Sequence, residues 1–293
     1  MKPLTDLPLI SKLSTRVIRI LGCNQGVMTL QGTNTYLVGT GTRRILIDTG
    51  GEETAPAYTK LLRDVLGKEK ATIEHLLITH WHDDHLGGVN PVLNTLKMLD
   101  IKATSRKVWK FQRAQHDKGT SESEKKTSWQ NLEDKQTFEV EGAKLRVEYM
   151  PGHTSDHATF ILEQENALFS GDCILGESTT TFDNLHDYTI SLNKILALKT
   201  KLIYPGHGPV VKDPEAVINY YTEHRLKRES EILDILQKNA KPNTLSEMDI
   251  VNHLYKNISR DKWEAAANNV ERHLDKLLKE GRVKGMKGKW QSI

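Results

Sequence analysis

Short apolar runs separated by clusters of glycine and threonine follow one another from residue 16 onward. These runs read RVIRILG, NTYLVGT and RRILIDTG, a spacing typical of strands joined by hairpin turns. Residues 54–66 instead place apolar side chains at helical spacing and lead into the run EHLLIT, which ends at Thr79. Helical spacing returns over residues 86–99, and further strand-like runs follow in KLRVEYM, ATFILE, NALFSGD and KLIYPGH. Strands mixed with amphipathic helices predict a layered α/β domain, with helices outside and sheet inside.

Residues 105–137 interrupt this pattern, because they are polar, rich in charge and without clear periodicity. We predict an irregular insertion or lid there. Part of it interleaves cations with aromatic rings, which would suit a grip on single-stranded RNA by charge and stacking. An amphipathic surface helix predicts the same spacing, so both interpretations stay open. The residues concerned are Lys107, Trp109, Lys110, Phe111 and Arg113.

The segment after residue 212 has a different rhythm. A long polar helix is expected from Asp213 to about Asn239, and two shorter capped helices are expected after it. Three helices followed by the basic hairpin RVKGMKGKWQ predict a winged helix-turn-helix, a fold often found on nucleic acid. We therefore expect a catalytic domain over residues 1–222 and a winged-helix-like domain over residues 223–293. The capping pairs that would start the two shorter helices are Thr244 with Glu247 and Asp261 with Glu264.

The hairpin itself could contact phosphates, because it carries four cations and no acid after Glu280. Trp290 would then be a stacking ring for a base. The alternative is a solvated hairpin whose tryptophan belongs to the domain core. The cations are Arg282, Lys284, Lys287 and Lys289.

Composition narrows the class of protein without choosing a substrate. Hydrophobic residues make up 37% and charged residues 27% of the 293, as in an ordinary globular chain, and no apolar run approaches the length of a membrane span. The net charge of +3 does not by itself indicate nucleic acid. Only Cys23 and Cys173 are present, which suits a reducing compartment. The start MKPLTDLPLI is not typical of a secretory signal, whereas the few early cations leave a mitochondrial presequence open.

The segment HWHDDH, residues 80–85, is the most informative part of the chain. It brings three imidazoles and a carboxylate together directly after an apolar strand, and these are ligands well suited to zinc. Three further candidates each follow an apolar run and adjoin a glycine, and Asp48 has the same context. Such residues gather at one edge of an α/β sheet. The candidate metal ligands are His80, His82, Asp84, His85, His153, Asp172 and His207.

The remaining histidines are expected on the surface or in the core, with no part in the site. His157 is intermediate, because it could support the site by a hydrogen bond or merely lie on the next strand. The others are His75, His116, His186, His224, His253 and His273.

These motifs resemble those of the metallo-β-lactamase superfamily over roughly residues 16–210, with its His-x-His-x-Asp-His signature at residues 80–85. The resemblance implies an αβ/βα sandwich that holds two Zn2+ ions per chain. It implies that Asp172 bridges the two metals and that Asp48 orders the floor of the site without binding metal. It assigns one zinc to His80, His82 and His153 and the other to Asp84, His85 and His207.

Asp172 also bears on the branch of the superfamily. True β-lactamases lack this aspartate, so a lactamase is disfavoured, although a register in which the Cys173 sulfur binds zinc stays open. A bridging carboxylate favours two close metals, the arrangement of hydrolytic nucleases and phosphatases. Thioesterases of the glyoxalase II type share these ligands and stay an alternative, acting on a glutathione or CoA thioester.

Along nearly its whole length the chain resembles an animal endoribonuclease branch of this superfamily. That resemblance implies cleavage of single-stranded RNA by a hydroxide that two zinc ions activate, in the mitochondrial matrix, with the cytosol as the alternative. Asp84 could orient the nucleophile as well as bind metal, and His157 is a candidate for protonating the leaving group. RNA is the expected partner, with no membrane and no obligate protein partner. A non-catalytic RNA-binding protein is a third hypothesis, disfavoured because every ligand position is occupied.

Overall fold

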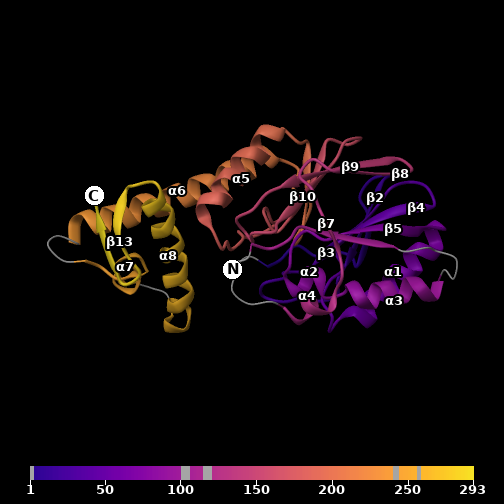
Figure 1. Cartoon of the computed structure of the whole chain (residues 1–293), viewed down its shortest axis with the longest axis horizontal. Helices are drawn as coiled ribbons and strands as arrows, with labels where there is room; N and C mark the ends of the chain where they lie inside the picture. Colours follow the sequence, from indigo (N-terminus) through magenta and orange to yellow (C-terminus); the bar gives the residue numbers. More distant parts are fainter. Residues whose placement is uncertain (1–2, 100–105, 115–120, 240–243, 256–258) are drawn as a thin grey trace.

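The computed structural model describes residues 3–99, 106–114, 121–239, 244–255 and 259–293. It shows a two-sheet sandwich and a smaller C-terminal unit, joined by the long helix α6 (Pro214–Asn239) (Figure 1). No helix within these ranges has the length and apolar character needed to cross a membrane.

Seven strands form the first sheet in the order β1 to β7. Neighbours are antiparallel as far as β4, and the pairs β4–β5, β5–β6 and β6–β7 are parallel. The strands are β1 (Ile10–Lys12), β2 (Val17–Leu21), β3 (Asn34–Val38), β4 (Arg43–Ile47), β5 (Thr72–Leu77), β6 (Lys107–Lys110) and β7 (Gln130–Asn131).

Five strands form the second sheet in the order β12-β11-β10-β9-β8. All pairs are antiparallel except β11–β12, which is parallel. The strands are β8 (Thr137–Val140), β9 (Ala143–Tyr149), β10 (Ala158–Leu162), β11 (Ala167–Gly171) and β12 (Leu202–Pro205).

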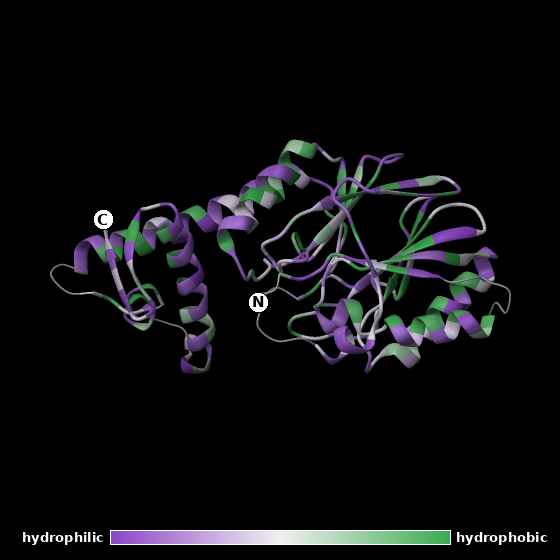
Figure 2. Cartoon of the chain, in the orientation of Figure 1, coloured by the Kyte–Doolittle hydropathy of each residue, from purple (hydrophilic) through white to green (hydrophobic). Residues whose placement is uncertain are grey.

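Each sheet is covered by helices on its outer face, which confirms the layered α/β domain predicted from the sequence pattern and the αβ/βα sandwich implied by the resemblance. One apolar core, with Tyr36, Phe160 and Phe169, fills the space between the sheets. A second core lies beneath α1 (Ala55–Glu69) and α3 (Val89–Leu99). A third lies beneath α5 (Leu185–Leu198) and the start of α6. Hydrophobic and hydrophilic residues alternate around α1 and α3, as expected for helices with one buried face (Figure 2).

The irregular insertion expected over residues 105–137 is wrong for its described part. Strands β6 and β7 extend the first sheet, and a short helix α4 (Glu122–Lys126) lies between them in sequence. The polar composition of residues 105–137 was misleading because some of its charged side chains are buried. Lys110 is fully buried, with Nζ 2.7 Å from Asp156 Oδ2 and 3.1 Å from Glu124 Oε1. Buried cations that pair with buried acids produce the same polar pattern as an exposed segment.

Of the five residues expected to grip RNA, Lys110, Phe111 and Arg113 are buried, whereas Lys107 is exposed and Trp109 is half-buried, so a grip by all five is wrong. The amphipathic helix is wrong too, because Lys107–Lys110 form the strand β6. Phe111 is buried, and the buried Arg113 pairs with Glu124 and lies over the Trp81 ring, 4.1 Å from its centroid. These side chains contact the protein itself. Residues 100–105 and 115–120, including His116, lie outside the described residues.

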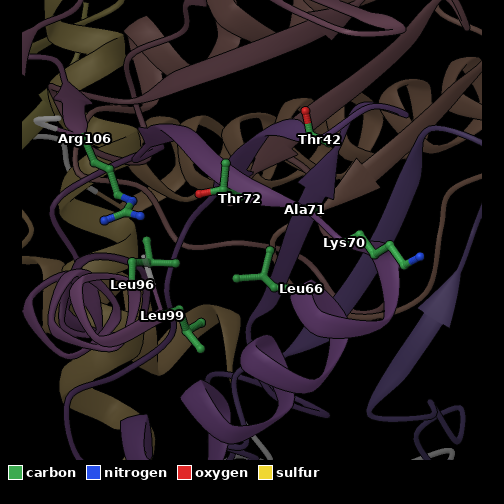
Figure 3. A pocket seen from close by; sticks show the side chains of 8 residues that line it. All are labelled: Thr42, Leu66, Lys70, Ala71, Thr72, Leu96, Leu99 and Arg106. Atoms are coloured by element: carbon green, nitrogen blue, oxygen red, sulfur yellow. The ribbon is translucent and has the colours of Figure 1, made fainter. Parts of the chain in front are cut away.

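A cavity of about 250 Å³ opens at the start of β5, between α1 and α3 (Figure 3). It lies at the end of β5 opposite to the residues 80–85, so it is separate from the candidate metal ligands. Its lining residues are Thr42, Leu66, Lys70, Ala71, Thr72, Leu96, Leu99 and Arg106.

The C-terminal unit has its own apolar core, built by the far half of α6 and the elements after it. The expected domain boundary at residues 222 and 223 falls within the continuous helix α6, and this division stays a prediction. The other elements are α7 (Glu247–Leu254), a 3-10 turn (Arg260–Lys262), α8 (Trp263–Lys279), β13 (Val283–Met286) and β14 (Lys289–Ser292).

Two details of this unit differ from expectation. The capping box at α7 pairs Ser246 with Asp249, because Glu247 instead accepts hydrogen bonds from the indole Nε1 of Trp290, at 2.7 Å, and from the Gly288 amide. Helix α8 begins after the 3-10 turn without a side-chain cap, and the side chain of Asp261 lies outside the described residues. Trp290 is only 2% exposed, so its interpretation as a stacking ring is wrong and the core alternative is confirmed.

Candidate metal centre

Loops at one edge of the two sheets carry every candidate residue. Asp48 follows β4, and the segment 80–85 follows β5 and enters the short helix α2 (Asp83–Leu86). His153 lies between β9 and β10, Asp172 follows β11, and His207 follows β12. The structure thus brings all seven candidate ligands together, in two groups.

The first group contains His80, His82, His153 and Asp172, whose ligand atoms all lie within 4.8 Å of one another. Nε2 of His80 is 2.9 Å from Nδ1 of His82, and Nε2 of His153 is 3.1 Å from the same atom. Burial, followed by repulsion from neighbouring imidazoles, lowers the pKa of His80 and lowers that of His82 to about 3. The rings of His80 and His82 are therefore neutral at pH 7, which is the form that binds metal.

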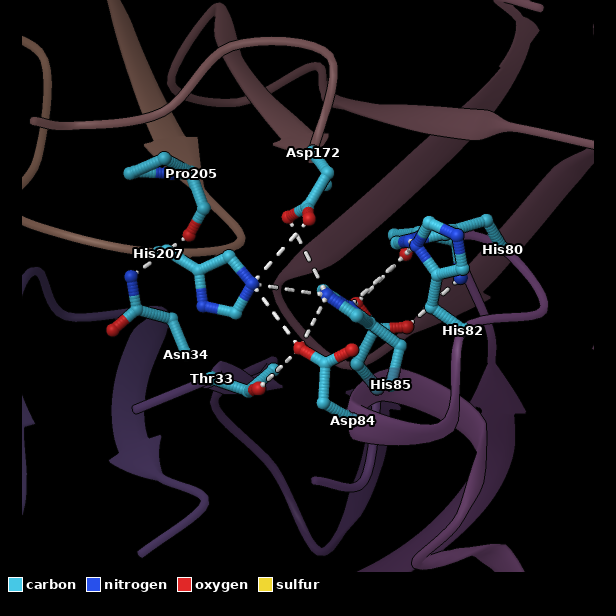
Figure 4. Close-up of polar contacts among 12 residues, drawn as sticks. Thr33, Asn34, His80, His82, Asp84, His85, Asp172, Pro205 and His207 are labelled. Atoms are coloured by element: carbon cyan, nitrogen blue, oxygen red, sulfur yellow. Dashed lines mark hydrogen bonds and ion pairs between the residues drawn. The ribbon is translucent and has the colours of Figure 1, made fainter. Parts of the chain in front are cut away.

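The second group contains Asp84, His85 and His207 (Figure 4). Oδ2 of Asp84 lies 3.3 Å from Nε2 of His85 and 3.2 Å from Nε2 of His207. Burial opposes protonation of His207, but Asp172 and Asp84 outweigh it and raise the pKa to about 9. Burial raises the pKa of Asp84, but the two histidines outweigh this effect and lower it. An anionic carboxylate therefore lies beside a cationic His207.

Asp172 faces both groups. Its Oδ1 is 3.4 Å from Nε2 of His85, and its Oδ2 is 3.3 Å from Nε2 of His207 and 3.7 Å from Nε2 of His153. The segment after β12 can lie this close to Asp172 because residue 206 is a glycine, where a Cβ would collide with the Asp172 carboxylate. A carboxylate between two sets of converging imidazoles fits two neighbouring metal ions.

Hydrogen bonds beneath the groups orient the rings. Asp48 accepts from the amide and hydroxyl of Thr79, at 2.8 and 2.9 Å, and its Oδ2 lies 2.8 Å from Nδ1 of His85. His157 is fully buried, and its Nε2 accepts from the Asp172 amide at 3.1 Å. It therefore supports Asp172, and its interpretation as a proton donor to a leaving group is wrong. The thiol of Cys173 is buried, and burial raises its pKa.

Neither group contains the Cys173 sulfur, so the structure does not support the alternative with a thiolate ligand. Among the described residues, the other histidines also lie outside both groups, as expected. These are His75, His186, His224, His253 and His273.

Three contributors were missed by the sequence reasoning. Thr33 donates its hydroxyl to Oδ2 of Asp84 at 3.0 Å (Figure 4). Thr180 and Thr181 contact Nδ1 of His153, through a hydroxyl at 3.1 Å and a carbonyl at 2.8 Å. Thr33 follows a glycine and precedes β3, so the glycine beside a strand was a usable signal for it. The two threonines lie in a loop with no comparable pattern.

Comparison with known families agrees with this geometry. Residues 28–207 match the profile of the Metallo-beta-lactamase superfamily. The chain belongs to the metallo-beta-lactamase superfamily. Residues 246–290 match the Beta-lactamase associated winged helix domain, which confirms the winged-helix fold expected for the C-terminal unit. Members of the superfamily are metal-dependent hydrolases, and the His/Asp cluster found here is suited to two metals.

Relatives within the metallo-beta-lactamase superfamily match most of the chain. A Beta-lactamase-like protein 2 homolog of Drosophila melanogaster is 46% identical over 95% of this chain and 93% of its own. A protein of the same name from Caenorhabditis elegans is 44% identical over 97% and 91%. An Atrochrysone carboxyl ACP thioesterase of Aspergillus fumigatus is 37% identical over 80% and 70%.

Solved structures support the superfamily fold alone. A metallo-beta-lactamase family protein from Thermus thermophilus aligns with a TM-score of 0.73 at 21% identity, covering 96% of this chain and 100% of its own. A beta-lactamase domain protein from Burkholderia ambifaria aligns with a TM-score of 0.78 at 16% identity, covering 97% and 93%. Both alignments include the C-terminal unit, since they extend over nearly the whole chain.

Proposed function

We propose that this metal-dependent hydrolase is a zinc endoribonuclease that cleaves phosphodiester bonds in single-stranded RNA. The observation that carries the proposal is the position of Asp172, whose carboxylate lies 3.4 and 3.3 Å from His85 and His207 of the second group and 3.7 Å from His153 of the first. Two close metals suit attack on a phosphodiester. The imidazole and carboxylate donors fit zinc.

The winged-helix domain favours RNA over a small substrate. Its hairpin exposes Lys284, Lys287 and Lys289. Lys287 pairs with Glu271 at 2.8 Å, and Arg282 pairs with Glu229 of α6 and with Glu280, which follows α8. The described residues offer no ion pair to Lys284 or Lys289. Two unpaired lysines on one wing can contact phosphates.

The residues of the site have distinct parts in the proposed reaction. Two bound zinc ions would supply a nucleophile at neutral pH and neutralise charge on the phosphoryl oxygens. Asp84, held by the Thr33 hydroxyl and anionic at pH 7, orients the attacking water and accepts its hydrogen bond. The oxygen of the water would bond to phosphorus as the bond from phosphorus to the 3′ oxygen breaks, and the 3′ oxygen would take a proton from solvent, which leaves a 5′-phosphate and a 3′-hydroxyl.

A thioesterase is the second candidate function. It is favoured by relatives named Atrochrysone carboxyl ACP thioesterase, which match 80% of the chain in Aspergillus fumigatus and 97% in Passalora fulva. The substrate would then be a glutathione, CoA or carrier-protein thioester. The same metal centre would serve, because zinc ligands do not distinguish a phosphodiester from a thioester.

One experiment separates these functions. Purified protein is assayed for zinc content, for cleavage of an unstructured RNA oligonucleotide and for hydrolysis of glutathione and CoA thioesters. The Asp172→Asn variant tests the site, and Asp64→Asn, at an exposed position on α1, is the matched control. Two zinc equivalents with RNA cleavage that Asp172→Asn alone abolishes, while RNA binding survives, would support the nuclease.

Other results would redirect the proposal. Two zincs with thioester hydrolysis and no RNA cleavage would establish the second candidate. RNA binding without any hydrolysis would point to a non-catalytic RNA-binding protein. Protein without zinc would overturn both hydrolase mechanisms.

We propose the mitochondrial matrix as the compartment, with the cytosol as the alternative. Both cysteines are free thiols, which suits either reducing compartment. RNA is the proposed partner, without a membrane or an obligate protein partner. Import of the labelled chain into isolated mitochondria tests the compartment, and a chain that stays outside and sensitive to protease would favour the cytosol.

A further inference from the structure

One face of α6 holds the loop between β11 and α5. The Tyr221 hydroxyl accepts from the Leu175 amide at 3.2 Å and donates to the Ser178 carbonyl at 3.0 Å. One helical turn later, Nη2 of Arg225 donates to the Thr180 carbonyl at 2.8 Å. The loop is therefore attached to α6 through its backbone at several points.

The same loop holds the candidate ligand His153. Its Nδ1 lies 2.8 Å from the Thr181 carbonyl, so this nitrogen carries the proton and donates it. Its Nε2 is then left without a proton and faces Nε2 of His80 and Nδ1 of His82. Arg225 holds the Thr180 carbonyl. The neighbouring Thr181 carbonyl selects the tautomer and the orientation of the His153 ring.

Arg225 is placed unusually for an arginine. It is only 7% exposed, and its guanidinium lies over the Phe182 ring, 4.7 Å from the centroid. Its Nε has no hydrogen-bond partner among the described residues. Burying a guanidinium that has few partners costs free energy, so a role in stability alone does not account for it.

The C-terminal unit also contacts Phe182, the ring over which Arg225 lies. His273 of α8 packs edge-on against Phe182, with 6.1 Å between ring centroids. Helix α6 itself continues from Arg225 into the core of the C-terminal unit, where Ile232 and Leu236 are buried. Phe182 therefore lies between the arginine that holds the loop and a side chain of the winged-helix domain.

We propose that Arg225 is a positioning residue for the metal ligand His153, acting through the backbone of Thr180 and Thr181. Through α6 and His273, the winged-helix domain supports the first group of ligands and so sets how firmly that group holds its metal. The inference rests on the metal centre of the proposed function, but it does not depend on whether the substrate is RNA or a thioester.

Zinc release tests this role. Full-length protein loaded with zinc is mixed with a chromogenic chelator, and the release of each zinc equivalent is followed in time. In Arg225→Met we expect one equivalent to leave roughly tenfold faster than in the native protein, with the other unchanged. Arg225→Lys, which keeps the charge and a donor, should fall between the two.

Arg228→Met is the matched control on the same helix. Arg228 pairs with Glu231 at 3.1 Å and lies over the Tyr255 ring, and no contact joins it to the loop among the described residues. Its zinc release should equal that of the native protein. General loosening of the fold would speed both equivalents alike, so faster release of one alone separates positioning from stability.

Three results would overturn the proposal. The first is native release of both equivalents from Arg225→Met, and the second is equal acceleration of both. If Arg225→Met does not fold, as judged by circular dichroism, native release from Arg225→Lys is the third. Native protein that holds no zinc would instead mean that the metal centre itself is wrong.

Discussion

Oδ2 of Asp48 lies 2.8 Å from Nδ1 of His85, and both side chains are buried. Asp48 reaches this position with a left-handed backbone, at a φ of 60°, which is uncommon outside glycine but tolerated by aspartate. The contact holds a proton on Nδ1 of His85, which donates it to Asp48. It thereby leaves Nε2 directed toward Asp84 and His207.

Replacing Asp48 by asparagine should weaken zinc binding at the second group. An amide cannot accept from the Thr79 amide, the Thr79 hydroxyl and His85 together, so the His85 ring loses its fixed orientation. We expect a loss of roughly 10- to 100-fold in affinity for one of the two zincs. Titration in competition with a chelator measures it, with Asp64→Asn as the control. Native affinity for both zincs would show that Asp48 does not orient the ligand.

Zinc binding should release protons at pH 7. Although burial opposes it, the neighbouring aspartates raise the pKa of His207 to about 9, so the ring is cationic in the metal-free protein. A ligand imidazole must be neutral, and zinc affinity should therefore rise as the pH increases toward 9. Calorimetry in buffers of different ionisation enthalpy counts the protons released. A heat of binding that is the same in every buffer would contradict this prediction.

Lys110→Met should strongly destabilise the catalytic domain. The substitution leaves the buried Asp156 without the cation that pairs with it, and it removes one of the two cations that pair with the buried Glu124, the other being Arg113. Breaking a buried pair in this way costs about 3–5 kcal/mol of the free energy of unfolding, which urea titration can measure. Lys125→Met, at an exposed pair with Glu122, should change it by less than about 0.5 kcal/mol. Equal effects of the two substitutions would contradict the assignment.

His273 should make the protein less stable in acid. Burial, followed by repulsion from Arg225, Arg228, Lys276 and His224, lowers its pKa to about 3. Below pH 6.5 the unfolded chain binds a proton that the folded chain does not, so the free energy of unfolding falls as the pH falls toward 3. Between pH 7 and pH 5 this amounts to about 2 kcal/mol.

The His273→Leu variant removes this contribution. Urea unfolding of the metal-free native and variant proteins at pH 7 and pH 5 measures it, because metal loss then affects neither. The variant should lose about 2 kcal/mol less than the native protein over that interval. An identical pH dependence in both would show that His273 is accessible to protons in the folded state.

The sequence pattern was sufficient for a layered α/β domain and for the seven residues that the structure brings together, whereas the two-sheet sandwich came from the resemblance. Asp172 and His207 each follow an apolar strand, and strands of one sheet bring their ends to a common edge. The pattern was insufficient for Thr33 and Arg225, whose partners Asp84 and Thr180 lie 51 and 45 residues away. Contacts between residues so far apart depend on how complete helices, strands and loops pack together, so the local periodicity of the sequence does not predict them.

Burial of polar groups accounts for the other errors. Because Lys110 is a lysine, it indicated an exposed segment. In the structure it is buried and forms an ion pair with Asp156, a residue far along the chain. Glu247 indicated the capping box of α7, yet it bonds to Trp290 in the hairpin that follows α8. In both cases a charged side chain satisfies a distant buried partner, so its local sequence context predicted the wrong role.

The order of residues along the chain has a consequence for biogenesis. A ribosome synthesises the last metal ligand, His207, before it synthesises Arg225 and His273, which support the loop around His153. The 66 residues from 207 to 273 take roughly 3 to 13 seconds at about 5–20 residues per second. During that interval a nascent chain holds a full set of ligands in an unfinished setting. We therefore expect zinc to enter the protein after translation ends.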